Sequence, residues 1–344
     1  MGRRGRSPGP RSHAAGRSAA AVAIAPAIAL APAPGSAPNV DRLNALNLGL
    51  MLVSAAVAWV TPFEVLLLSY AVLGPLHYLT EISWLHDRRF FTTGRLDALA
   101  LAALGALAFL ARYVPAVAWH GWIVLALGLA AGFAFATTAR AKLALTLAAV
   151  VASLAIERWT AGWLFLIVML PTVIHVFFFT GLFILHGSVK SRSAWGYASF
   201  AVFLACGALL LFYRPDAARY AVGPRTAAFS EEFWSVIDQL ALLVRAPAGW
   251  DGLVAIGRFL GFAYTYHYLN WFSKTGIIRW HDVGAPRIAA IGVLYVASLA
   301  LYAYDYRVGL VALALLSLVH VFLELPLDVR TGAALLGIEP ARVR

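Results

Sequence analysis

Long apolar blocks follow one another along almost the whole chain, and they constrain its fold more than any other feature. A helix that crosses the hydrocarbon core of a bilayer needs roughly 20 apolar residues, and the blocks approach that length. Only 12% of the residues are charged, whereas a soluble domain has about 25%. A soluble globule of this size must cover its surface with polar groups, but a lipid-facing surface needs few. The sequence therefore predicts an all-α, polytopic transmembrane helix bundle.

The apolar blocks predict about ten transmembrane helices within a bundle that extends over residues 44–328. Residues 1–43 are basic and rich in Ala and Pro, which predicts a disordered tail. Residues 329–344 are predicted to form a short cytoplasmic tail. Apolar residues at helical spacing near 229–244 predict an amphipathic helix that lies on the bilayer surface. The expected transmembrane helices are 44–61, 63–84, 96–113, 117–136, 142–157, 162–185, 194–213, 252–273, 288–304 and 308–326.

The basic residues are unevenly divided between the two sides of this bundle. If the ten helices alternate in direction, one side holds 19 of the 27 Lys and Arg residues. The positive-inside rule places that side, with both termini, in the cytoplasm. Topology thus accounts for the formal charge of +11, and we expect no nucleic-acid partner. We expect an integral protein of a bacterial-type inner membrane.

Four of the nine histidines fall well inside predicted helices that all run from the outside to the cytoplasm. Each lies about two turns before the cytoplasmic end, so they share one depth in the membrane. Two of them are followed after four residues by a glutamate, which lies on the same helix face. Ionisable side chains inside a membrane are costly and are functional candidates by default. The candidate metal ligands are His77, Glu81, His175, His267, His320 and Glu324.

A second tier of polar residues lies nearer the cytoplasm. Two histidines are at the predicted membrane border, and a third follows one of the buried histidines on nearly the same helix face. An asparagine lies one turn below another buried histidine, where it could orient the imidazole. These second-tier residues are His86, His186, His281 and Asn270.

The ligand types indicate which metal to expect. Imidazole and carboxylate without thiolate suit iron, zinc, copper or manganese. The single cysteine, Cys206, excludes intrachain disulfides and clusters held by several cysteines. We expect non-haem iron, with another first-row metal or a haem as alternatives.

The segment GPLHYLTE, residues 74–81, is similar to a Gly-Pro-His…acid pattern. With the other candidate ligands, it resembles the membrane-embedded, histidine-cluster iron oxygenases: desaturases, alkane hydroxylases and membrane carotenoid-cleaving enzymes. The H-x-x-x-H and H-x-x-H-H boxes of the desaturases are absent, and no single family accounts for the whole chain. The resemblance implies a metal-dependent membrane oxidoreductase that acts on a lipid-like or isoprenoid substrate. Membrane lipid, a lipophilic small molecule and an electron donor are then the expected partners.

Two other functions fit the same residues. Two of the histidines could be axial ligands of a haem in an electron-transfer protein. Alternatively, the histidines with Glu81 and Glu324 could relay protons in a proton-coupled transporter. The sequence assigns no catalytic residue, and a metal analysis with an absorption spectrum would distinguish the three functions.

Overall fold

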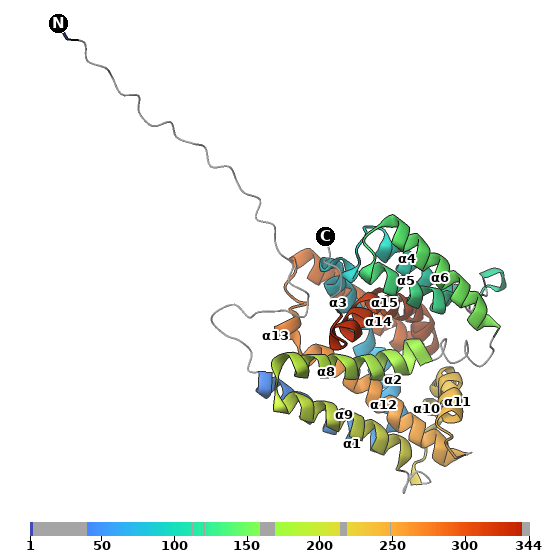
Figure 1. Ribbon diagram of the computed structural model, residues 1–344. Coiled ribbons are helices and arrows are strands. Elements are labelled where there is room, and N and C mark those ends of the chain that lie inside the picture. Colours follow the sequence, from blue (N-terminus) through green and yellow to red (C-terminus); the bar gives the residue numbers. More distant parts are fainter. Residues whose placement is uncertain are drawn as a thin grey trace. The chain divides into compact units, whose positions relative to one another are not determined.

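The computed structural model describes residues 1–2, 40–111, 113–117, 119, 121–158, 169–213, 219–247 and 249–338. The regular structure in these ranges is entirely helical (Figure 1). Residues 31–344 form one unit, and it is this unit that we describe. Most of the predicted disordered tail lies outside the described residues, but helix α1 already begins at Val40, earlier than the expected end of the tail at 43.

The described residues form helices that range from 3 to 30 residues in length. In order they are α1 (Val40–Val60), α2 (Pro62–Leu68), η1 (Ser69–Leu73), α3 (Gly74–Asp87), η2 (Arg89–Phe91), α4 (Asp97–Leu110), η3 (Pro115–Val117), α5 (Gly121–Phe135), α6 (Ala139–Glu157), η4 (Leu170–Phe179), α8 (Thr180–Ser191), α9 (Ala194–Phe212), α10 (Pro224–Ser230), η6 (Glu231–Phe233), α11 (Trp234–Leu243), α12 (Trp250–Ser273), α13 (Thr275–Ile278), α14 (Ala285–Tyr304) and α15 (Tyr306–Leu335).

Seven helical segments in the described residues are long and apolar enough to cross a membrane, which supports an integral membrane protein. Helices α4 and α5 coincide with expected spans but have only 14 and 15 residues. Helix α12 has 24 residues but is not among the seven. The count of ten spans and the cytoplasmic position of both termini therefore stay predictions. The seven segments are Val40–Val60, Pro62–Asp87, Ala139–Ile156, Leu170–Ser191, Ala194–Phe212, Ala285–Tyr304 and Tyr306–Leu335.

Helix α12 is enclosed by other helices. These neighbours keep its polar side chains, such as His267 and Asn270, away from lipid. Helix α12 packs against α1, α2, η1, α9 and α11, and 18 of its 24 residues are buried. Gly261 allows a close approach, because a Cβ atom there would lie 2.8 Å from the carbonyl oxygen of Pro62. Such small residues let membrane helices pack backbone to backbone.

Helix α15 is the second central element. It contacts α3, α4, α5, α8 and α14, and Figure 1 shows α4, α5 and α6 grouped beside it. The sequence predicted that this helix ends at residue 326 and that a tail begins at residue 329, but the helix continues through Pro326 to Leu335. Proline usually ends a helix because it lacks an N–H group and clashes with the preceding turn. Here the residues around Pro326 are buried by neighbouring helices, whose packing outweighs that cost.

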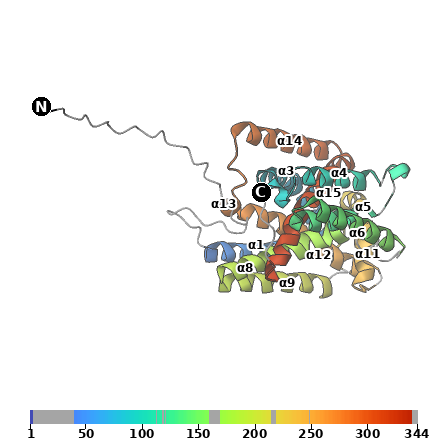
Figure 2. The same cartoon turned by 45° about the horizontal axis from the view of Figure 1, so that its top comes forward.

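The outer helices present apolar side chains away from the bundle. Only 11% of the α6 and α14 spans is buried inside the protein, and Figure 2 shows α14 on the periphery. Exposed leucines and valines such as Leu147, Val151 and Val293 cover these helices. A surface of this kind is suited to lipid.

The predicted amphipathic helix near 229–244 corresponds to the short helices α10, η6 and α11. Ile237 and Leu240 are buried in the core that α11 shares with α12, whereas Leu242 is 79% exposed. The position of this segment on a bilayer surface stays a prediction.

Candidate metal centre

Four buried histidines from four different segments meet inside the bundle. His77 lies on α3, His175 on η4, His267 on α12 and His320 on α15. Their exposed fractions lie between 1% and 8%. The four histidines that the sequence singled out therefore lie in one interior cluster.

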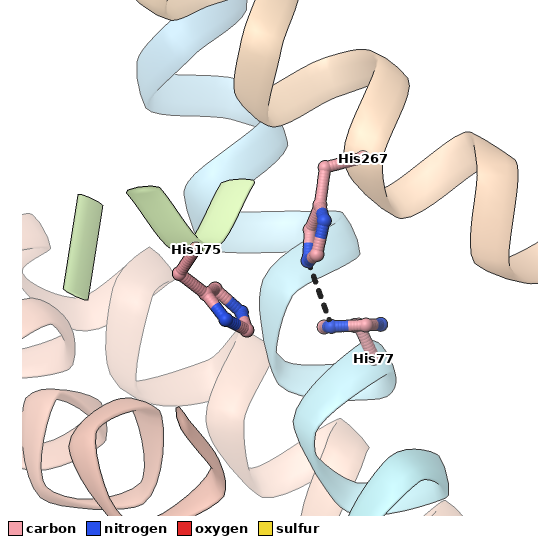
Figure 3. A group of neighbouring side chains, drawn as sticks. All are labelled: His77, His175 and His267. Carbon is pink, nitrogen blue, oxygen red and sulfur yellow. Dashed lines mark hydrogen bonds between the residues drawn. The ribbon is translucent and has the colours of Figure 1, made fainter. Parts of the chain in front are cut away.

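The four imidazoles form a closed ring of neighbours. Ring centroids are 4.7 Å apart for His77 and His267, 5.0 Å for His267 and His175, 5.1 Å for His175 and His320, and 5.4 Å for His320 and His77. In Figure 3 the rings of His77, His175 and His267 point toward one another, and the Nε2 atoms of His77 and His267 are 3.1 Å apart. Two nitrogens that bind one ion at about 2.1 Å each are separated by about 3 Å. The spacing suits a shared metal ion.

Two glutamates complete the cluster. The Glu81 carboxylate lies 2.9 Å from Nε2 of His77 on the same helix, and the Glu324 carboxylate lies 3.4 Å from Nδ1 of His175. Their ligand atoms, with those of the histidines, form overlapping sets in which all atoms lie within 4.8 Å of one another. These sets are His77–His175–His267, His77–Glu81–His320 and His175–His320–Glu324.

Several of these buried polar atoms have no hydrogen-bond partner in the described part of the chain. They include Nε2 of His175, both nitrogens of His320 and Nδ1 of His77. Oε2 of Glu81 and Oε2 of Glu324 lie 2.9 and 3.4 Å from imidazole nitrogens, but these contacts lack hydrogen-bond geometry. A buried polar atom without a partner is costly, and one cation can satisfy several such lone pairs together. These buried histidines and glutamates can therefore hold a metal ion.

Thr180 fixes the orientation of one imidazole. Its hydroxyl oxygen lies 2.8 Å from Nδ1 of His267 and is buried at the first residue of α8. When Nδ1–H donates to this hydroxyl, the lone pair of Nε2 faces the centre of the cluster. Partners of this kind set the tautomer and orientation of metal-binding histidines.

Aromatic side chains hold two further imidazoles. The Tyr78 ring stacks on His320 at 4.2 Å, and its hydroxyl shares a 2.8 Å hydrogen bond with that of Tyr268. The Tyr268 ring lies 5.2 Å from His77. The two tyrosines thus form one wall of the cluster.

Two π-helical segments determine how the histidines face one another. His175 lies within η4, and η1 ends just before the helix that carries His77. A π turn adds a residue to the helical repeat and is often found at functional sites. It rotates the following side chains relative to an uninterrupted α-helix, so it affects which face reaches the bundle interior.

The second-tier residues do not join the cluster. The side chain of His86 is 65% exposed and contacts Asp87, and His281 is also exposed. His186 lies on α8, partly buried, but belongs to none of the ligand sets. Asn270 is buried, yet its side-chain oxygen accepts a 3.5 Å hydrogen bond from Tyr266. The partner of His267 is Thr180, not the asparagine that sequence reasoning proposed.

Sequence reasoning missed a third buried carboxylate, Asp328. It is 1% exposed, and neither of its oxygens has a hydrogen-bond partner among the described residues. It follows Glu324 by four residues, just as Glu324 follows His320, so the three lie on one face of α15. This repeated spacing was the available signal, but ending the helix at Pro326 placed Asp328 beyond the last expected transmembrane helix.

An apolar groove of about 530 Å³ lies between α2, η1, α10, α14 and α15. Leu67, Ala71 and Tyr302 are among its lining residues, and Glu64 lines it as well. The Glu64 carboxylate accepts hydrogen bonds of 2.8 and 2.9 Å from the Tyr220 hydroxyl.

Aromatic residues connect the groove wall with the histidine cluster. Tyr70, adjacent to the groove residue Ala71, contacts the Tyr78 ring at 6.4 Å, and Tyr78 stacks on His320. Tyr70 and Tyr78 thus form an aromatic layer that leads from the segment lining the groove to His320.

Comparisons with known proteins identify no relative. No protein-family model matches the chain, and no curated protein or solved structure matches it significantly. The site must accordingly be interpreted from its own geometry.

Proposed function

We propose that this protein is a membrane-embedded, metal-dependent oxidoreductase with a non-haem iron centre, acting on a lipid-like or isoprenoid substrate. One observation carries the proposal: four buried imidazoles and two buried carboxylates converge, and many of their lone pairs have no hydrogen-bond partner among the described residues. A cluster that served only for packing would be expected to satisfy its polar atoms internally.

The donor set favours iron over the alternatives. Imidazole and carboxylate suit iron, manganese, zinc and copper, and no thiolate is present to favour softer ions; Cys206 lies in an apolar core on α9. A haem would need room for its macrocycle between facing imidazoles. His77 and His267, whose Nε2 atoms approach to 3.1 Å, leave no such space between them, which disfavours a haem at this pair.

The residues of the site have separate roles in this proposal. The four histidines would bind the iron, and Glu81 and Glu324 would bind it or neutralise its charge. Thr180 orients His267, and the surrounding helices exclude water. When bound, a non-haem iron with open positions supplies the activation of dioxygen and the oxidation of an organic substrate.

The surroundings of the site support a lipophilic substrate. The groove beside the aromatic layer is mainly apolar, and its volume is within the usual range for small-molecule sites. Helix α14, which lines the groove, is largely exposed on the periphery and suits lipid contact. The Glu64 carboxylate would repel an anionic headgroup there. A neutral chain, such as an isoprenoid hydrocarbon or alcohol, fits better than a fatty-acid anion. The apolar helices support an integral membrane protein, and we propose a bacterial-type inner membrane as its location.

A proton-coupled transporter is the second candidate. The ladder of His320, Glu324 and Asp328 on one face of α15 resembles the ionisable chains of proton relays. A transporter of this kind would function without a bound metal, so metal analysis separates the two proposals.

The test is metal analysis of the purified protein with an absorption spectrum. We expect at least one iron ion per chain and an absorption spectrum without a Soret band. The double variant His77→Ala/His267→Ala should lose the metal, whereas His186→Ala, outside the ligand sets, should keep it. A wild-type protein without metal, a Soret band, or full metal retention in the folded double variant would each contradict the proposal.

A further inference from the structure

Two tryptophans form a continuous path from the candidate metal centre to one end of the bundle. The Trp271 ring lies 5.4 Å from the His77 ring, and the Trp84 ring lies 5.5 Å from Trp271. The guanidinium of Arg88 lies 4.1 Å from the Trp84 ring. We call Trp84 and Trp271 the tryptophan bridge. It leads to the end where α3 and α12 finish, which the distribution of basic residues predicts to be cytoplasmic.

The tryptophan bridge is not a pair of interfacial anchors. Tryptophans that anchor a helix sit at the membrane–water interface, but Trp84 and Trp271 are only 7% and 9% exposed. Their N–H groups are used inside the protein: Trp271 donates to the Thr80 hydroxyl at 3.1 Å and Trp84 donates to the carbonyl of Ile278 at 2.9 Å. Both rings are therefore held in fixed positions.

Strained backbone holds Trp84 from two sides. Arg89, Phe90 and Phe91 have positive φ angles of 50°, 53° and 55°, and Arg279 has a φ of 56°. The left-handed region is unfavourable for residues with a Cβ atom, and such strain is often found at functional sites. Phe91 packs on the Trp84 ring at 5.7 Å. Arg279 directly follows Ile278, whose carbonyl accepts the hydrogen bond from the Trp84 indole N–H. The strain is thus located where it fixes the outer ring of the bridge.

The end of the tryptophan bridge carries more basic than acidic side chains. Asp87 pairs with Arg287, and Asp282 pairs with Arg279. Arg88 and Arg89 lie at the same end, so the basic side chains outnumber the carboxylates. An excess of one charge steers a partner of the opposite charge and raises its rate of encounter.

We propose that the tryptophan bridge carries electrons to the metal centre from an acidic one-electron carrier protein that docks at this basic end. The inference rests on the proposed function, because a redox-active metal must be present. In each encounter the reduced carrier loses one electron and the oxidised iron ion gains it, and no atom is transferred. The rate of electron tunnelling falls steeply with the distance across space that no bonded atoms fill. Because the two tryptophan rings are in contact, they shorten that distance between the surface and His77.

The test is the rate at which the carrier reduces the iron. The full-length protein would be loaded with iron, oxidised, and mixed rapidly with a reduced, acidic [2Fe–2S] ferredoxin while the ferric signal is followed. We expect Trp84→Leu to slow this reduction at least tenfold, and Trp84→Phe, which keeps a ring, to slow it much less. Trp280→Leu is the matched control, because Trp280 contacts Phe272 and His281 and lies off the path.

Two controls separate the path from the metal site. Dithionite, a small reductant that needs no docking, should reduce Trp84→Leu as fast as wild type, and both proteins should contain equal iron. Arg88→Gln should slow reduction by the ferredoxin at low salt, whereas Arg307→Gln, which removes the partner of Glu231, should not. Carrier reduction of Trp84→Leu at the wild-type rate, or equal slowing with dithionite, would overturn the inference. A wild-type protein that binds no iron would instead overturn the proposed function.

Discussion

Thr180 and His267 are 87 residues apart in the chain, yet the threonine hydroxyl lies 2.8 Å from Nδ1 of the imidazole. The contact leaves the other nitrogen of His267 directed at His77, 3.1 Å away. A buried hydroxyl thus connects the start of α8 to the position of a candidate metal ligand on α12.

Thr180→Val should weaken metal binding by about 10–100-fold, the usual effect of removing a partner that orients a ligand. Valine has nearly the same shape but cannot accept the Nδ1–H bond. The measurement is the affinity for added Fe²⁺ in a competition assay with a chelator. Ser188→Ala is the control, because Ser188 lies on the same helix and its hydroxyl donates only to the Ile184 carbonyl. Wild-type affinity in Thr180→Val would show that the hydrogen bond does not position the imidazole.

Lys274 provides a prediction about pH. It follows the last residue of α12, and burial lowers the pKa of its ammonium group to about 8 from an ordinary 10.5. Between these values the unfolded chain binds more protons than the folded one, so stability rises as the pH increases through this window. Below pH 8 the cost of burying the charge is fully present.

Lys274→Met should therefore be more stable than wild type at pH 7, and the difference should shrink as the pH rises from 8 to 10.5. Thermal unfolding in detergent at several pH values measures it. Lys142→Met is the contrasting variant, because Lys142 pairs with Asp97 and its loss should destabilise the protein. A difference between Lys274→Met and wild type that does not change with pH would contradict the assignment.

The sequence predicted the helices well where apolar length alone defines them. The expected block 194–213 corresponds to α9 (Ala194–Phe212), and 252–273 corresponds to α12 (Trp250–Ser273). Clustering of the four histidines also followed from the sequence, because side chains at one depth on parallel helices can meet only inside the bundle.

Other features depend on contacts that no local pattern contains. The π-helical segment η4 changes the rotation of the helix around His175, and a 3.6-residue repeat does not reveal such a turn. Thr180 meets His267 only through the packing of two helices. Asp328 was missed because proline normally ends a helix, whereas the neighbours of α15 stabilise it beyond Pro326.

Reporter fusions test the topology. The positive-inside rule predicts that the C-terminus is cytoplasmic and that the connection between α9 and α12 is on the other side. Fusions after residue 344 and within 219–223 should therefore give opposite signals with a reporter that is active in one compartment only. The same compartment for both fusions would refute the predicted arrangement of helices.

Glu324 and Asp328 offer a matched pair for testing which carboxylate binds the metal. Both are buried on one face of α15 and have oxygens without hydrogen-bond partners among the described residues. Only Glu324 belongs to a set of ligand atoms within 4.8 Å, with His175 and His320. Glu324→Gln should therefore lose at least tenfold in metal affinity, and Asp328→Asn should keep the wild-type affinity.

Thermal unfolding with and without metal distinguishes lost binding from a folding defect. Both amides remove a charge that is costly to bury, so neither Glu324→Gln nor Asp328→Asn should be less stable than wild type without metal. A ligand at 100 times its Kd stabilises the folded state by about 2.7 kcal/mol, and each tenfold loss of affinity removes about 1.4 kcal/mol of this gain. Added iron should thus raise the Tm of wild type and Asp328→Asn similarly, and that of Glu324→Gln by much less. The reverse result, with metal lost in Asp328→Asn and retained in Glu324→Gln, would place the ion one turn further along α15.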